Sequence, residues 1–359
     1  MDIKILPLDP VEMKIAPTED FGFGNKFANR MFTQKYVRGV GWHDAQIGPY
    51  ENFSLAPSTA VLHYAQEIFE GTKAYRRQDG HVNLFRPWEN MKRFNRSAMR
   101  MSMPLVDEED HLTALVNLVE LEQEWVPSAP GASLYIRPAM FATEAALGVH
   151  ASESYLHFII AGPVGAYFKE GFSPIPVFIS DKHRRAVRGG VGAAKTGGNY
   201  AASLFVGDDA AAKGYSQVLW LDAMEGRFVE EVGAMNICFV YDGQRIVTPP
   251  LSDSILAGVT RDSVLRLAPD LGYEVAEEQV DVFEMIADLQ SGRITEVFGC
   301  GTAAVIAPVG KFGFQDDEYF INKNQPGPVS EKLFRSLTDI QYGRVEDKYG
   351  WTLKIENNP

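Results

Sequence analysis

The chain has 359 residues, of which 45% are hydrophobic and 23% charged, and its formal net charge at neutral pH is −13. This length predicts two domains, and an acidic surface would repel the phosphate backbone of a nucleic acid. The two cysteines predict no disulfide framework, and the seven scattered histidines offer no pair at metal-ligand spacing.

The N-terminal stretch carries acidic residues and prolines where a secretory signal would have a basic start and an apolar run. No later apolar stretch of the sequence is long enough to span a bilayer. We therefore expect a cytoplasmic protein without a membrane partner.

Residues 1–163 predict a smaller α+β domain. Strands are expected at 58–65, 82–86, 133–142 and 155–160, and helices near 87–102 and 109–125. The glycine- and proline-rich segment that follows is typical of a linker, which we place at 164–176.

Residues 177–359 predict a second, larger α/β domain, so that the fold class is α/β (α+β) with two domains. Strands are expected at 176–180, 216–222, 226–249 and 295–301, and helices near 199–213, 260–271 and 330–342. Small-molecule sites favour the clefts between domains.

Lys195 is the only charged residue of the stretch GGVGAAKTGGNYAASLFVG, residues 189–207. One interpretation is a solvated surface loop, although such a loop would contain more polar residues. A second is a degenerate phosphate loop at 189–196, in which Ala194 replaces a required glycine. The third is a lysine nucleophile whose pKa is lowered by apolar surroundings, as Schiff-base chemistry with pyridoxal phosphate requires.

Such a cofactor would need a phenol, a carboxylate and a phosphate site. Tyr200 lies five residues after Lys195 and could supply the phenol. The strand pattern of 228–239 contains Glu230 and Glu231 on opposite faces, and the face of Glu231 carries more apolar residues. A bulge at Gly233 would instead leave both glutamates at a rim.

Two segments could bind the phosphate. A helix beginning near Val259 and Thr260 would offer backbone N–H groups, as any helix start does. In the helix near 87–102, the pattern predicts that Arg93 is a surface residue paired with Glu89 four positions earlier.

Eight segments together resemble the branched-chain amino acid aminotransferases, which are fold-type IV pyridoxal-phosphate enzymes. In chain order they are VLHYAQEIFEGTKAY, NLFRPWENMKRFNRSAMRMSMP, SLYIRPAMFATE, PVGAYF, AAKTGGNYAASL, EEVGAMNI, GVTRDS and TEVFGCGTAAVIAPV. The resemblance implies a two-domain fold with the active site in the cleft between the domains, and a homodimer or a larger homo-oligomer.

The resemblance also implies how the cofactor is held. Pyridoxal phosphate would form a Schiff base with Lys195, which would also transfer the proton during catalysis. Glu231 would bind the ring nitrogen and Tyr200 the ring oxygen. The implied phosphate ligands are Arg93, Val259, Thr260 and Thr302.

For the substrate, the resemblance implies an apolar side-chain pocket, a site for the α-carboxylate and a site for a distal carboxylate. The pocket would include Tyr64, Phe69, Tyr135 and Tyr167, with Val149 contributed by the neighbouring subunit. Thr302 and Ala303 would bind the α-carboxylate with help from Tyr64. Arg137 would bind the distal carboxylate of glutamate or 2-oxoglutarate.

The implied reaction interconverts leucine, isoleucine or valine with their 2-oxo acids by a ping-pong mechanism, with glutamate and 2-oxoglutarate as the second pair. A D-amino acid aminotransferase and an aminodeoxychorismate-lyase-like enzyme share the same lysine, glutamate and cofactor and are the alternatives. A more distant alternative is a nucleotide-binding protein that uses 189–196 as a degenerate phosphate loop.

Two positions depart from the pattern of some family members. Ala304 and Ala307 stand where some animal members have a C-x-x-C redox pair, so no such switch is expected. Ala234 replaces a threonine that in some members forms a hydrogen bond near the cofactor.

Overall fold

The computed structural model describes residues 1–11, 13–165 and 172–356. The chain forms two compact units, the first made of Met1–Tyr167, Ala194–Gly197 and Asp339–Pro359, and the second of Phe168–Ala193 and Gly198–Thr338. Lys195 therefore belongs to the first unit, although the chain on both sides of its short segment belongs to the second. Within the expected linker 164–176, residues 166–171 lie outside the described part, and the domain bounds stay a prediction.

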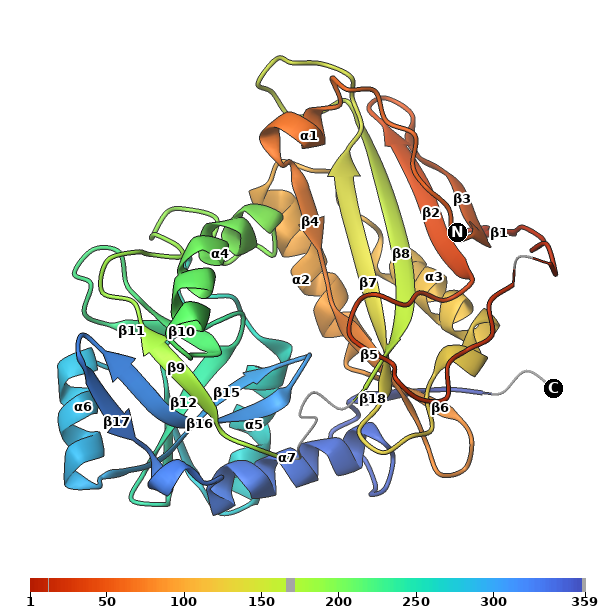
Figure 1. Ribbon diagram of the computed structural model, residues 1–359. Helices are drawn as coiled ribbons and strands as arrows, with labels where there is room; N and C mark the ends of the chain where they lie inside the picture. The colour runs from red at the N-terminus through yellow and green to blue at the C-terminus, as the bar shows by residue number, and fades with distance from the viewer. Residues whose placement is uncertain (12, 166–171, 357–359) are drawn as a thin grey trace. The chain divides into compact units, whose positions relative to one another are not determined.

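The first unit is built on one mixed sheet, visible in Figure 1, with the strand order β1-β3-β2-β8-β7-β5-β6-β18 and with β4 paired to β7. Its pairings are antiparallel except for β1 with β3. Its strands are β1 (Lys4–Ile5), β2 (Arg30–Val37), β3 (Gly41–Pro49), β4 (Glu67–Phe69), β5 (Thr72–Arg76), β6 (Val82–Phe85), β7 (Ser133–Ala142), β8 (Ser154–Val164) and β18 (Thr352–Ile355).

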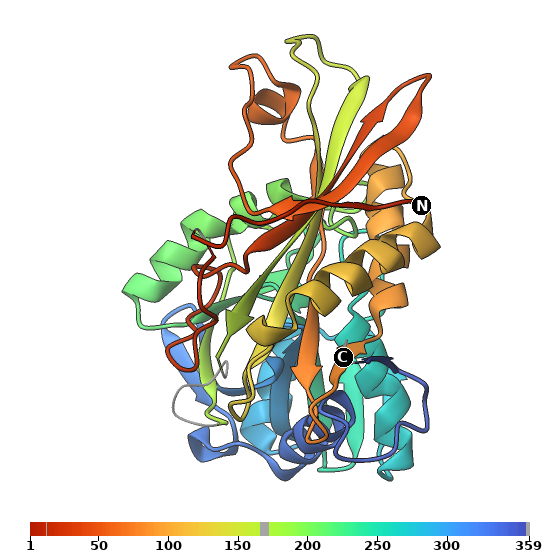
Figure 2. The same cartoon turned by 90° about the vertical axis from the view of Figure 1, so that its right-hand side faces the viewer.

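Two longer helices, α2 (Pro87–Arg100) and α3 (Glu108–Leu121), pack on each other and against this sheet (Figures 1 and 2). Proline stands at the start of α2, where a missing N–H costs nothing. Asp107 caps α3 by accepting hydrogen bonds from the backbone of Glu109 and Asp110. The apolar face of α3 then packs into a core of strand residues that includes Phe32, Leu84 and Leu134.

The second unit contains another mixed sheet, with the order β11-β10-β9-β16-β15-β12-β13-β14 and with β17 paired to β16. Strand β9 lies parallel to both of its neighbours. The strands are β9 (Ile175–Ile179), β10 (Gln217–Leu221), β11 (Val229–Val232), β12 (Asn236–Tyr241), β13 (Arg245–Thr248), β14 (Glu274–Glu277), β15 (Ile294–Gly301), β16 (Val305–Phe314) and β17 (Asp317–Phe320).

Helices α4 (Gly197–Ala212), α5 (Val259–Asp270) and α6 (Val282–Ser291) accompany this sheet, and α7 (Pro328–Gln341) follows it. The described residues also form 3-10 turns at Gln123–Trp125 in the first unit and Asn322–Asn324 in the second. The core of the second unit lies between its strands and α6 and includes Val177, Leu219 and Phe312. Within the described residues, no helix has both the length and the apolar character needed to cross a membrane.

The fold class predicted from the sequence is confirmed, but two of the expected strands are wrong. Residues 58–65 contain the short helix α1 (Ala60–Tyr64), which ends because Ala65 adopts a left-handed conformation and turns the chain into β4. Residues 228–239 form a hairpin of β11 and β12 instead of one strand. Gly233 has φ +56°, so the chain reverses there, and Val232 pairs with Met235.

Candidate functional site

Hydrogen bonds of the backbone fix the position of Lys195. Its N–H donates to Ser97 Oγ at 2.9 Å, and its carbonyl accepts from Phe69 N–H at 3.0 Å. Next to it, Thr196 Oγ1 donates to the carbonyl of Glu67 at 2.7 Å, and the Gly197 N–H donates to the Glu67 carboxylate. Strand β4 and helix α2 therefore fix where the amine lies.

The surroundings of Lys195 favour the neutral amine. Nζ lies 4.7 Å from the centre of the Phe69 ring. Burial, with a smaller contribution from the nearby Arg93, lowers the pKa of Lys195 to about 8, although Glu70 acts in the opposite direction. At neutral pH roughly a tenth of the amine is then uncharged, compared with less than about a thousandth at the ordinary pKa.

Arg93 is buried on α2, with 4% of its surface exposed. Its Nε and Nη2 donate to the two oxygens of Glu70 at 2.7 and 2.9 Å. The predicted pairing with Glu89 is wrong, because Glu89 instead contacts Lys92 at 3.2 Å. Burial alone would raise the pKa of Glu70, but the Arg93 charge and its hydrogen bonds bring that pKa below its usual value.

Arg137 lies among aromatic rings on the same unit. Its guanidinium carbon is 4.7 Å from the centre of the Phe69 ring and 5.3 Å from that of Tyr135. Nη2 also donates to the Tyr135 hydroxyl at 3.2 Å. A partly buried cation with aromatic neighbours can accept a carboxylate while leaving room for an apolar group.

Two other predicted substrate residues lie near the loop after β7. The Tyr64 hydroxyl donates to the carbonyl of Leu147. Val149, two residues further along, is 85% exposed. Tyr167, the remaining member of the predicted pocket, lies outside the described residues.

Glu231 is buried in the second unit, and several groups contact its carboxylate. Arg185 Nη2 lies 2.5 Å from Oε2, while the Leu256 N–H and Asn236 Nδ2 donate to Oε1 at 3.2 and 3.3 Å. Arg185 also donates to the carbonyl of Ser254 at 2.5 Å. The arginine compensates the burial of the carboxylate, which would be costly without a partner.

Glu230 is also buried, with 6% of its surface exposed. Trp220 pairs with Glu231 and Leu221 with Val229, so that Glu230 is the extra residue of a bulge in β11. The register shift therefore occurs at Glu230 instead of Gly233, and neither glutamate lies at a rim. Burial raises the pKa of Glu230, opposed by the hydrogen bond from Ser254.

The other predicted cofactor residues of the second unit lie at turns and helix starts. Tyr200 is in the first turn of α4, and Val259 and Thr260 open α5 as the sequence predicts. Thr302 and Ala303 form the turn between β15 and β16. Helix starts and tight turns present backbone N–H groups suited to anions.

The phosphate-loop interpretation of 189–196 does not match this geometry. Helix α4 begins at Gly197, after both Lys195 and Thr196, whereas a phosphate loop carries those two residues into its helix. The Thr196 hydroxyl is bonded to the backbone of Glu67.

Sequence reasoning missed three residues that position the predicted site. Glu70 binds Arg93, Ser97 binds the backbone of Lys195, and Arg185 binds Glu231. Glu70 stands inside a quoted motif, but no periodicity distinguishes its carboxylate from that of Glu67. Arg185 lies 46 positions before its partner Glu231, so no local sequence pattern could predict that the two residues pair.

Comparison with known proteins gives concordant results. Residues 67–312 match the family described as amino-transferase class IV. The branched-chain-amino-acid transaminase 1 of Bacillus subtilis is 51% identical over 335 residues, which cover 93% of this chain and 94% of that protein. Among solved structures, the Escherichia coli branched-chain amino acid aminotransferase has a TM-score of 0.75 at 29% identity, covering 90% of this chain and 99% of that one. The branched-chain amino acid aminotransferase of T.th., solved with pyridoxamine 5'-phosphate, has a TM-score of 0.74 at 29% identity over 90% of this chain and 98% of that one.

Proposed function

The chain belongs to the class IV aminotransferase family, and from that premise we propose that it is a transaminase of branched-chain amino acids that uses pyridoxal phosphate. It interconverts leucine, isoleucine or valine with their 2-oxo acids, with glutamate and 2-oxoglutarate as the second pair. The observation that carries the proposal is the partly buried Lys195, whose pKa is lowered to about 8 beside Arg93 and Phe69. Identity near 50% to relatives with branched-chain names supports the choice of substrate class over the D-amino acid and aminodeoxychorismate alternatives.

The residues present fit pyridoxal phosphate. A lysine with a lowered pKa suits a carbonyl, and a buried arginine suits a phosphate. Arg93 would bind the phosphate together with Val259, Thr260 and Thr302. Glu231 would face the ring nitrogen and Tyr200 the ring oxygen.

When bound, the cofactor supplies an electron sink for the bond between the substrate α-carbon and its hydrogen. The Lys195 amine removes the proton from the α-carbon, and in the reverse half-reaction it delivers a proton to that same atom. Glu231, which pairs with Arg185 Nη2 at 2.5 Å, would hold a proton on the ring nitrogen. These tasks require a lysine that gives up its proton more readily than usual and a buried carboxylate with a cationic partner.

One substrate pocket must accept both aliphatic and acidic side chains. The rings of Phe69 and Tyr135, together with Tyr64 and Tyr167, would contact the aliphatic groups. Arg137 would bind the distal carboxylate of glutamate, because its guanidinium lies against the Phe69 and Tyr135 rings. The backbone N–H groups of Thr302 and Ala303 would bind the α-carboxylate common to all substrates.

The protein acts as a homodimer or a larger homo-oligomer in this proposal. Val149 is 85% exposed and Leu147 61%, in the loop that the Tyr64 hydroxyl contacts. Large apolar side chains exposed together mark interaction surfaces. A second copy would cover this loop and receive Val149 at its own substrate pocket. A cytoplasmic location is part of the same proposal.

The test is spectroscopic and catalytic. Purified protein mixed with pyridoxal phosphate should gain a visible absorption band that borohydride abolishes, with mass added at Lys195. Lys195→Ala should lose transamination of L-leucine with 2-oxoglutarate, while Lys213→Ala, just beyond α4 and half-exposed, should retain it. A colourless protein, or full activity in Lys195→Ala, would refute the proposal.

The choice between the glutamates has its own test. Glu231→Gln should lower kcat severely, because a neutral amide no longer holds a proton on the ring nitrogen. Glu230→Gln should retain most of the activity. The reverse order would assign the ring nitrogen to Glu230.

A further inference from the structure

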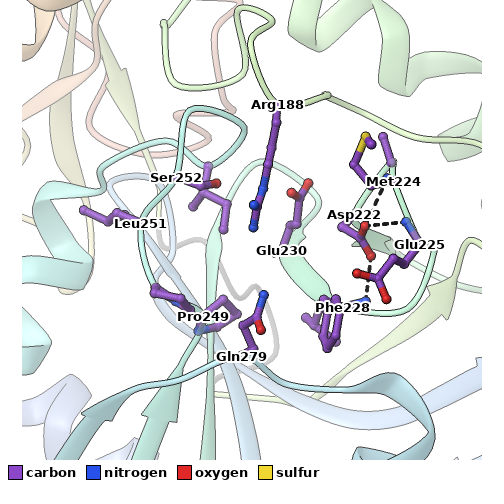
Figure 3. A pocket seen from close by; sticks show the side chains of 14 residues that line it. Arg188, Asp222, Met224, Glu225, Phe228, Glu230, Pro249, Leu251, Ser252 and Gln279 are labelled. Atoms are coloured by element: carbon purple, nitrogen blue, oxygen red, sulfur yellow. Dashed lines mark hydrogen bonds between the residues drawn. The ribbon is translucent and has the colours of Figure 1, made fainter.

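A second pocket lies in the second unit (Figure 3). Its volume is about 250 Å³, and its walls come from β11, from the turn before it and from the loop between β13 and α5. The lining includes Glu230 but not Glu231, and neither Tyr200 nor any of the residues proposed to bind the cofactor phosphate. The pocket is therefore distinct from the cofactor site proposed above.

Glu230 supplies an incompletely bonded carboxylate to this pocket. Its Oε1 accepts a hydrogen bond from Ser254 Oγ at 2.5 Å. Its Oε2 is buried and has no hydrogen-bond partner among the described residues. A buried charged oxygen without a partner costs free energy, so a ligand that donates to it would stabilise the site. The bulge at Glu230 directs its side chain into the pocket lining.

Arg188 supplies the opposite charge. Figure 3 shows its side chain extending into the pocket beside Glu230. The two residues form no ion pair within the part of the chain that the structure describes, although the Arg188 charge acts to lower the pKa of Glu230. Two opposite charges that face one pocket without contact match a ligand carrying both an ammonium and a carboxylate.

Another carboxylate of the lining, that of Asp222, already accepts hydrogen bonds from the backbone. Asp222 accepts hydrogen bonds from four N–H groups of the following turn, at 2.7 to 3.0 Å. Burial by itself would raise the pKa of Asp222, but these hydrogen bonds bring that pKa below its usual value. Glu230 is thus the buried carboxylate of this pocket that remains available to a cation.

Most of the remaining lining residues have apolar side chains. They include Phe228, Pro249, Leu251 and Ile255. The volume of about 250 Å³ is near the lower end of ligand pockets, which begin at about 300 Å³. Such a pocket suits a small molecule with an aliphatic group and excludes a nucleotide.

We propose that this pocket binds a free α-amino acid with a small aliphatic side chain, as a second site apart from the cofactor. The ammonium of the ligand donates to Glu230 Oε2, its carboxylate binds Arg188, and its side chain packs on Leu251 and Ile255. The proposal rests on the proposed function only for the choice of leucine as the probe.

A short chain of contacts connects this pocket to the proposed cofactor residues. Ser254 binds Glu230 through its hydroxyl, and its carbonyl accepts from Arg185, which pairs with Glu231. Three successive contacts therefore connect an ammonium group bound at Glu230 with Glu231, the carboxylate that would bind the ring nitrogen. By linkage, leucine and the cofactor should each change the affinity of the other by the same factor.

The test is calorimetric titration of L-leucine into holoenzyme reduced with borohydride, which cannot turn over. Leucine should bind, and Glu230→Gln should weaken that binding at least about tenfold, the loss expected for a charged hydrogen bond. Arg188→Met, on an exposed residue that should not affect folding, should also weaken it. Glu225→Gln removes an exposed carboxylate of the same lining and should change the affinity less than about threefold, because surface charges contribute little.

Two analogues test the zwitterion requirement. Isopentylamine lacks the carboxylate, and 4-methylvalerate lacks the ammonium, so each should bind at least about tenfold more weakly than leucine. Leucine binding unchanged in Glu230→Gln, or isopentylamine binding as tightly as leucine, would overturn the proposal. If the protein binds no pyridoxal phosphate, the proposed function fails, and the same titration of untreated protein still decides the second site.

Discussion

At the scale of single residues, the pKa of Lys195 gives a directional prediction. Burial lowers this pKa to about 8, so the reactive neutral amine should accumulate as pH rises towards 8 and reach a plateau above it. The rate at which apoprotein captures pyridoxal phosphate should follow the same curve, rising roughly tenfold between about pH 7 and pH 9. Stopped-flow absorbance from about pH 6 to pH 10 measures it. A rate still rising steeply above about pH 9 would contradict the lowered pKa.

The ion pair of Glu70 with Arg93 yields a second prediction at this scale. Glu70→Gln leaves Arg93 buried without a full counter-charge, which should lower the free energy of unfolding by about 3 kcal/mol. Glu89→Gln is the matched control, because Glu89 contacts Lys92 at the surface, and it should change stability by less than about 0.5 kcal/mol. Urea unfolding of the apoprotein measures both. Equal losses of unfolding free energy in the two variants would show that the buried ion pair stabilises the protein no more than the surface pair does.

The sequence allowed some of these residues to be predicted from local composition alone. Lys195 is detectable because a lone charge among small residues is unusual. Arg93 is not, because its position in the helix pattern fits a surface arginine and its partner Glu70 lies 23 residues earlier, between β4 and β5. Glu231 was predictable only in part. The alternation of residues favoured Glu231 as the buried glutamate, but it did not predict the bulge that buries Glu230 as well.

At the scale of elements, the turn between β11 and β12 depends on Gly233. Its φ of +56° lies in the left-handed region, and a Cβ added there would collide with Gln217 Oε1. Gly233→Ala should therefore cost about 1–2 kcal/mol of stability and displace the neighbouring Glu231. Chemical denaturation and the affinity for pyridoxal phosphate measure the two effects.

A matched glycine in α4 should respond in the opposite direction. Gly207 lies inside this helix, and a Cβ added there meets no atom within 4 Å. Gly207→Ala should raise stability by about 0.5–1 kcal/mol, because alanine is the better helix former. If both Gly233→Ala and Gly207→Ala lowered stability, the backbone conformation of the glycine would not determine whether alanine stabilises or destabilises the protein.

Elements with a strong periodic pattern were predictable, and short ones were not. The strand expected at 133–142 coincides with β7, and the helices near 87–102 and 109–125 correspond to α2 and α3. Residues 58–65 alternate like a strand, but the positive φ of Ala65 ends a five-residue helix there. The alternation of residue types therefore did not predict the short helix that forms there.

At the scale of the whole molecule, the sheets join segments that are far apart in the sequence. Strand β18, near the end of the chain, pairs with β6 from its first quarter. In the second unit β16 lies beside β9, although six strands and three helices separate them along the chain. Pairings of this kind depend on which edges remain open once the local elements have formed, so the fold class was predictable while the strand order was not.

Two buried histidines should make the first unit sensitive to acid. The rings of His111 and His157 lie 4.9 Å apart, among Phe32, Trp42 and Phe94. Neither ring nitrogen of His157 has a hydrogen-bond partner among the described residues. Burial lowers the pKa of His111 to about 4 and that of His157 well below its ordinary value.

Because both pKa values are lowered by folding, the stabilising contribution of the neutral pair is complete above the ordinary histidine pKa of 6.5. As pH falls from there to about 4, the unfolded chain binds protons that the folded chain excludes, so unfolding becomes more favourable. His111 alone should account for about 3 kcal/mol across this range. Urea unfolding at small pH steps measures the slope. His157→Phe, which keeps an aromatic ring in the core, should flatten it, whereas His150→Gln, on an exposed loop, should leave it unchanged. An unchanged slope in His157→Phe would assign the acid sensitivity to other groups, because a residue that does not exclude protons on folding cannot contribute to it.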